Sequence, residues 1–207
     1  MNTGRVAAGD EWPLDDVSVL PGYAFGTRSP VVWGAALLVA IESTMMGLLL
    51  VSEIYLRGNQ QAWPHLAFPR KVVGIAVVEL ALLLGSLVPA ALSARAARRE
   101  QVERSRSSLI AATVLGVMML VVRGYLFGHL PFRWDEHALG SVFWTALVLH
   151  TTHVFAGVAE YGVLIALLFR GPVEKKNFVD VEASWVLWAF SVLEWIPATV
   201  LLYGAGQ

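Results

Sequence analysis

The sequence predicts an all-α fold, an antiparallel bundle of five transmembrane helices. Of its 207 residues, 57% are hydrophobic and only 15% are charged, which is outside the usual composition of soluble proteins. Five apolar segments also reach the length of about 20 residues that a helix needs to cross a membrane. They are too long for barrel strands, and helices satisfy their own backbone hydrogen bonds in lipid. The predicted spans are residues 31–56, 72–93, 109–127, 141–169 and 181–203.

Turn and charge signals bound the first three spans. The first span follows Pro30 and ends before Arg57-Gly58-Asn59, where a charge and a glycine interrupt the apolar run. The second span follows the basic pair Arg70-Lys71, and an arginine-rich segment at residues 95–106 separates it from the third. Because glycine, proline and runs of charge mark loops, we expect continuous apolar helices between these signals.

The last two spans are bounded in the same way. Residues 128–140, which begin and end with glycine, lead into the fourth span, and Gly171-Pro172 ends it. Short connections predict that successive spans pack antiparallel. Residues 1–29 form a polar N-terminal tail, which we expect to be retained because no apolar run follows the start as in a secretory signal. One membrane domain is expected at residues 30–207.

Composition excludes several classes of function. The net charge of −1 provides no basic surplus for nucleic acid, so no nucleic-acid partner is expected. Without cysteine there are no disulfides, thiolate metal sites or c-type haem attachments. Neither a Gly-x-x-x-x-Gly-Lys phosphate loop nor a Gly-x-Ser-x-Gly nucleophile elbow occurs. No catalytic, cofactor-binding or metal-binding residue is predicted in this chain.

The distribution of Lys and Arg predicts the orientation, because cytoplasmic loops carry an excess of them. With the N-terminus inside, ten lie on the inner side and four on the outer side, which favours an N-in, C-out topology. The four outer residues are Arg57, Arg70, Lys71 and Arg133.

Nine ionisable residues fall within the predicted spans, where exposure to lipid would be costly. At about 1.5 Å rise per residue, Glu42, His153 and Glu194 each lie roughly 17–20 Å from the start of their spans, so we expect them to meet near the midplane. A hydrogen bond between Glu42 and His153 is expected, with His150 as the alternative partner. The nine residues are Glu42, Glu53, Glu79, Arg123, His150, His153, Glu160, Glu182 and Glu194.

A second set of charges lies toward the outer face. Arg123 is expected to pair with Glu53 or Glu79, and such pairs often fix helix register without moving an ion. His150-x-x-His153 places two imidazoles about 60° apart around one helix, which suits joint metal chelation less well than an i, i+4 pair. We therefore interpret these charges as structural.

Aromatic and small residues also have structural interpretations. Trp185, Trp188 and Trp195 are expected to be lipid-facing packing residues of the last span. The glycines expected to permit close contact between helices are Gly47, Gly74, Gly85 and Gly157.

Four blocks of the sequence form a combined pattern. They are His150-Thr-Thr-His153-Val-Phe-Ala-Gly157, the closing segment with Val181-Glu182-Ala-Ser184, Trp188-x-Phe190 and Trp195, the segment at residues 128–143, and Ile41-Glu42-Ser43. The first resembles the HGLHVxxG helix of subunit III of haem–copper terminal oxidases, and the others resemble its closing helix, the loop before the His-x-x-His helix, and its buried Glu. The likeness runs from about residue 30 to the end, and the chain looks like the five-helix bacterial form.

This resemblance implies an accessory subunit without a redox centre. Its partners would be the haem- and copper-bearing subunit I and subunit II of a complex of the cytochrome c oxidase type, alone or in a larger supercomplex, in a bacterial cytoplasmic membrane. The chain would support subunit I stability and proton uptake and would bind phospholipid. By the same match, Glu42 and one of the two histidines would form the buried pair, and Glu182 would belong to the scaffold. The residues implied in lipid or packing contacts are Trp185, Trp188, Phe190 and Trp195.

The sequence departs from the family at one place, and two other functions stay open. The closing helix of the family usually reads Trp-His-Phe-x-Asp, whereas Ala189 and Val192 replace its His and Asp here. One alternative is an accessory subunit of nitric-oxide reductase. The other is a small proton or ion transporter with Glu42, His153 and Glu194 as a relay, although alternating access is harder to build without an internal repeat.

Overall fold

The computed structural model describes residues 30–59, 68–170 and 178–204. These residues form five helices, each long and apolar enough to cross a membrane, which confirms the predicted number and type of elements. The predicted tail at residues 1–29 and the turn at Gly171-Pro172 lie outside the described residues. The helices are α1 (Pro30–Asn59), α2 (Arg70–Arg98), α3 (Val102–Phe127), α4 (Ala138–Arg170) and α5 (Phe178–Gly204).

The helices extend beyond the apolar spans. The arginine-rich segment is mostly helical, because α2 continues to Arg98, α3 begins at Val102, and only residues 99–101 form the turn. Arg and Gln are good helix formers, so the loss of hydropathy marks the end of the apolar surface and not the end of the helix. Glu100 adopts a φ of 58° in this turn, and the Gln101 N–H donates to the carbonyl of Ala96 at 2.9 Å.

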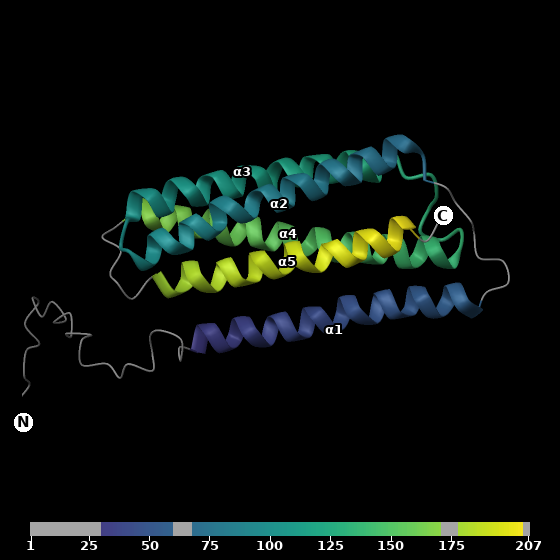
Figure 1. Cartoon of the computed structure of the whole chain (residues 1–207), viewed down its shortest axis with the longest axis horizontal. Coiled ribbons are helices and arrows are strands. Elements are labelled where there is room, and N and C mark those ends of the chain that lie inside the picture. The colour runs from purple at the N-terminus through teal and green to yellow at the C-terminus, as the bar shows by residue number, and fades with distance from the viewer. Residues whose placement is uncertain (1–29, 60–67, 171–177, 205–207) are drawn as a thin grey trace, which may run out of the picture.

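The five helices lie side by side (Figure 1). α2 and α3 form one side of the bundle, α4 and α5 lie in the middle, and α1 runs along the opposite side, where it packs mainly against α4 and α5. Much of the apolar surface of α1 faces outward, with Trp33 65% and Leu37 64% exposed. In a membrane, such a surface contacts lipid or a neighbouring protein.

Local hydrogen bonds fix the start of α4. The Gly140 N–H donates to Nδ1 of His137 at 2.8 Å, which satisfies one of the backbone donors that a helix leaves unpaired at its first turn. Ser141 Oγ donates to the carbonyl of Trp134 at 2.8 Å. These bonds tie the segment before α4 to the helix.

Trp188 and Trp195 of α5 contradict the expectation that they face lipid. Trp188 and Trp195 are only 2% and 1% exposed. The indole N–H of Trp188 donates to Oγ of Ser86 on α2 at 2.9 Å, so the ring is buried without an unpaired donor. The ring fits because neighbouring positions have no side chain: a Cβ on Gly116 or Gly157 would lie 2.7 Å from the indole.

Other packing expectations have mixed outcomes. Trp185 and Phe190 are partly buried. Gly157 permits close helix contact as expected, whereas a Cβ on Gly47, Gly74 or Gly85 would meet nothing within 4 Å in the described part of the chain. Those three glycines therefore bring no helices of this chain closer together.

Candidate functional site

His153 connects three helices through two carboxylates. Its Nδ1 donates to Oε1 of Glu194 on α5 at 2.9 Å, and its Nε2 lies 3.7 Å from Oε1 of Glu42 on α1. The side chains are 8%, 6% and 18% exposed for His153, Glu194 and Glu42. The three residues meet as expected, but the hydrogen bond goes to Glu194, and Glu42 is held only at ion-pair distance. The imidazole and the two carboxylates can each hold a proton. The cluster can therefore balance its own charge without an external ion.

Arg123 forms the centre of a second cluster. Both it and Glu79 are fully buried, and Arg123 Nε donates to Glu79 Oε1 at 2.8 Å. Its Nη1 donates to the Leu147 carbonyl at 3.1 Å and to Oγ1 of Thr151 at 3.0 Å, and the guanidinium carbon lies 4.8 Å from the ring centre of Trp195. Of the two expected partners, Arg123 therefore pairs with Glu79. An ion pair with this many hydrogen bonds is one that a buried environment can tolerate.

His150 belongs to the Arg123 cluster and not to Glu42. Its ring stacks on Trp195, with centroids 4.1 Å apart and planes 7° from parallel. Nε2 lies 3.1 Å from the carbonyl oxygen of Ser191, which can only accept, so Nε2 carries the hydrogen. The lone pair of Nδ1 then faces Arg123 Nη2 at 3.4 Å. His150 thus acts as a hydrogen-bond acceptor for the guanidinium.

Glu53, the other expected partner of Arg123, stands apart. Its side chain is fully buried, and neither carboxylate oxygen has a hydrogen-bond partner among the described residues. It is therefore the least satisfied of the acids that the sequence placed in the spans.

A third group of polar residues lies toward the end of the bundle where α5 begins. Ser184 Oγ lies 2.5 Å from Oε1 of Glu160. A crevice of about 70 Å³ is lined by Glu160 together with Glu42 and His153, which gives room for ordered water beside all three. Glu182 lies nearer the surface, where it accepts from Arg98 Nε at 2.6 Å in a pair whose side chains are 66% exposed for Arg98 and 32% for Glu182.

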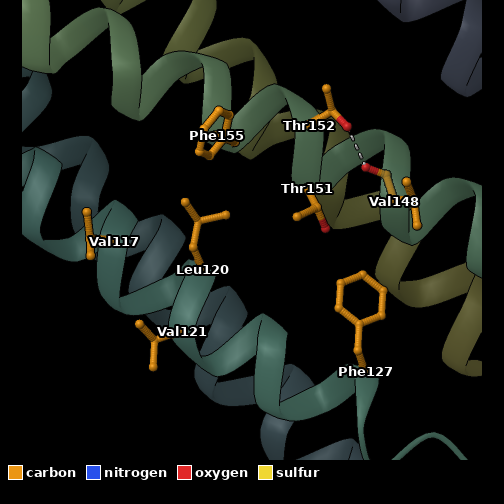
Figure 2. A pocket seen from close by; sticks show the side chains of 8 residues that line it. All are labelled: Val117, Leu120, Val121, Phe127, Val148, Thr151, Thr152 and Phe155. Atoms are coloured by element: carbon orange, nitrogen blue, oxygen red, sulfur yellow. Dashed lines mark hydrogen bonds between the residues drawn. The ribbon is translucent and has the colours of Figure 1, made fainter.

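An apolar groove lies between α3 and α4 (Figure 2). Its volume is about 550 Å³. The lining has only two hydroxyls, and both are already bonded: Thr151 Oγ1 donates to the Leu147 carbonyl at 2.6 Å, and Thr152 Oγ1 donates to the Val148 carbonyl at 3.0 Å. The groove therefore suits a hydrocarbon chain better than a polar ligand. It is lined by Val117, Leu120, Val121, Phe127, Val148, Thr151, Thr152 and Phe155.

Within residues 30–59, 68–170 and 178–204, no group of three or more His, Asp or Glu side chains could hold a metal ion. His129 and His137 make local bonds instead, to the Tyr125 carbonyl at 2.8 Å and to the Gly140 N–H.

Sequence reasoning missed the small polar partners of the large buried groups. Thr151, Ser86 and Ser184 complete the bonding of Arg123, Trp188 and Glu160. The sequence contains one signal that Ser86 is buried with the charges: it lies seven residues after Glu79 and so shares the same face of the second span.

No family model matches the chain, whereas several curated proteins are similar to part of it. Cytochrome c oxidase subunit 3 of Triticum aestivum is 27% identical over 104 residues, which cover 50% of this chain and 39% of that protein. The subunit 3 proteins of Pisaster ochraceus and Drosophila yakuba are 25% and 22% identical, over 48% and 64% of this chain and 38% and 50% of their own lengths. The matched regions thus span half or less of these curated relatives. The chain resembles cytochrome c oxidase subunit 3 and has the helices of a multi-pass membrane protein.

Proposed function

We propose that this chain is an accessory subunit of a respiratory haem–copper oxidase of the cytochrome c oxidase type, in the role of subunit III and without a redox centre of its own. The observation that carries the proposal is its similarity to cytochrome c oxidase subunit 3 proteins from a plant and two animals. Haem and copper would be held by partner subunits I and II. The complex would lie in a bacterial cytoplasmic membrane.

The arrangement of the buried charges is consistent with a structural role beside the redox subunits. Arg123 is bonded to an acid and a carbonyl within the chain and His153 to an acid, and such buried contacts hold helices in register with one another. The outward apolar surface of α1 gives subunit I a face to pack on. The carboxylates beside His153 would help keep proton uptake by the complex stable, because they can hold a proton close to that face.

The proposed topology is an antiparallel bundle with the N-terminus inside. Two contacts between α2 and α3 support alternating directions: Ser93 lies beside Ser105, and Glu79 lies beside Arg123. Residue numbers therefore rise along α2 as they fall along α3. The excess of Lys and Arg at the inner connections supports the orientation.

Phospholipid binding is part of the proposal. The groove between α3 and α4 would hold one acyl chain, since its lining presents hydrocarbon and two hydroxyls that are already bonded (Figure 2). The acyl chain would cover the apolar surface that the contact between α3 and α4 leaves exposed.

Purification from the native membrane tests the proposed function. The tagged chain, extracted in mild detergent, should bring down haem- and copper-bearing subunits, and the assembly should consume oxygen. Recovery with a haem partner that reduces nitric oxide instead would support the nitric-oxide reductase alternative. A stable lone chain that carries protons across liposomes would support the transporter.

The Glu42→Gln variant tests the role of the His153 cluster. We expect it to shorten the lifetime of activity during turnover more than it lowers the initial rate of oxygen consumption. Immediate loss of oxygen reduction in an intact complex would contradict a supporting role.

A further inference from the structure

The turn between α2 and α3 holds a pocket that the proposed function does not use. Its volume is about 360 Å³, and three of its eight lining side chains are arginines, whereas none is acidic. The pocket shares no lining residue with the apolar groove or with the crevice beside His153. It is lined by Leu92, Arg95, Ala96, Arg99, Gln101, Arg104, Ser107 and Ser108.

The arginines of this turn fall into two groups. Arg98 and Arg106 are engaged elsewhere, the first with the carboxylate of Glu182 and the second over the ring of Phe169 at 4.3 Å. Both therefore have a partner in the chain and lie outside the pocket lining.

Among the described residues, the pocket arginines form no ion pair with a carboxylate. The Arg104 guanidinium donates to the amide oxygen of Gln101 at 3.2 Å. Arg95 and Arg99 are exposed, and their guanidinium groups have no hydrogen-bond or ion-pair partner in the described part of the chain. Arg95 lies in the last turn of α2 and Arg99 directly follows the end of that helix, so two positive charges line the same pocket. A bound anion would offset the repulsion between them.

The donor set suits a phosphate group. Guanidinium groups present paired N–H donors that match phosphate oxygens, and such charge-assisted bonds are stronger than neutral ones. Ser108 adds a hydroxyl without a partner in the described residues, whereas Ser107 Oγ already donates to the Arg104 carbonyl at 3.1 Å. Glu100 and Glu103 flank the turn but do not line this pocket.

The place of the pocket favours a lipid over a free anion. Leu92, 48% exposed, belongs to the apolar span and forms the pocket edge one turn before Arg95. A ligand in this pocket therefore meets apolar surface on the side of the membrane core and arginines on the side of water. Basic pockets between helix ends at the cytoplasmic surface bind anionic headgroups for the same reason.

We propose that this pocket binds the phosphate of an anionic phospholipid, with the start of an acyl chain against Leu92. The inference rests on the membrane placement given under the proposed function, and it does not depend on the identity of the partner subunits.

The test measures phosphatidylglycerol binding to the purified full-length chain in detergent by native mass spectrometry. The site variant carries Arg95→Gln, Arg99→Gln and Arg104→Gln. Since each Arg near an anionic lipid contributes roughly fivefold in affinity, the variant should bind about a hundredfold more weakly. The matched control carries Arg57→Gln, Arg70→Gln and Arg133→Gln, which remove the same charge at the other end of the bundle, and it should bind as the wild type does.

Three results would overturn the inference. One is an equal loss of affinity in the control variant, which would indicate general charge attraction. Another is equal binding of phosphatidylcholine, which has no net charge. The third is displacement of the lipid by millimolar inorganic phosphate, which would identify a site for a free anion. Tryptophan fluorescence of both variants verifies folding, because the replaced arginines do not contact the buried tryptophans.

Partner recovery is measured separately on the same variants. Binding of phosphatidylglycerol without co-purifying oxidase subunits would leave the lipid site standing and reject the proposed function. Recovery of the oxidase subunits with no selective lipid binding would reject the lipid site and support the proposed function.

Discussion

Removal of one partner of the Arg123–Glu79 pair should cost far more stability than removal of both. Arg123→Met leaves the buried Glu79 carboxylate without its cation and also removes the donors to Leu147 and Thr151. Unpairing a buried charge costs about 3–5 kcal/mol, whereas replacing both members by apolar groups of similar size is often close to neutral. We therefore expect a loss of about 3–5 kcal/mol for Arg123→Met or Glu79→Met alone, and less than about 2 kcal/mol for the double variant.

Unfolding in mixed micelles, followed by tryptophan fluorescence, measures these differences. Trp195 lies 4.8 Å from the Arg123 guanidinium and so reports on the site. Arg98→Gln, in the exposed pair with Glu182, is the control and should cost at most about 1 kcal/mol. If the losses in the two single variants simply add in the double variant, the pair is not coupled and the reasoning is refuted.

Three further predictions use the same measurement. Gly157→Ala should destabilise the chain by about 1–3 kcal/mol, because its Cβ would overlap a buried indole, whereas Gly85→Ala, which meets nothing, should be neutral or stabilising; equal effects would exclude the close contact. Glu194→Ala should cost about 1.5–3 kcal/mol and Glu42→Ala less than half of that, since only Glu194 is within hydrogen-bond distance of the shared imidazole; the reverse order would contradict this geometry. Trp188→Phe should cost about 1–3 kcal/mol, because it removes the indole hydrogen bond and part of the ring volume. An unchanged midpoint of unfolding would show that neither the bond nor the volume contributes to stability.

Hydropathy was sufficient to predict the five helices but not their rotation about their own axes. The predicted depth of Glu42, His153 and Glu194 in the membrane was sufficient to place them at one level, because the rise per residue of a helix is fixed. The choice of Glu194 over Glu42 as the hydrogen-bond partner depends on the spacing between helices, and no pattern within one helix contains that distance. For the same reason the sequence left Arg123 with two candidate acids.

The tryptophans illustrate a second limit. A Trp in an apolar span is compatible with lipid and with a protein core, because its ring is large and its N–H needs one partner. Trp188 is buried because Gly116, Gly157 and Ser86, on three other helices, leave it space and an acceptor. Such a pocket is assembled from segments far apart in the sequence and is visible only once they are packed.

The position of α1 has a consequence for biogenesis. α1 is synthesised before the other four described helices, yet its main packing partners, α4 and α5, are synthesised after α2 and α3. At about 5–20 residues per second, translation continues for several seconds or more after Glu42 before His153 is available. Throughout that interval Glu42 has no imidazolium to pair with its carboxylate, so α1 depends on the insertion machinery, or on a neutral carboxyl group, until α4 is in place.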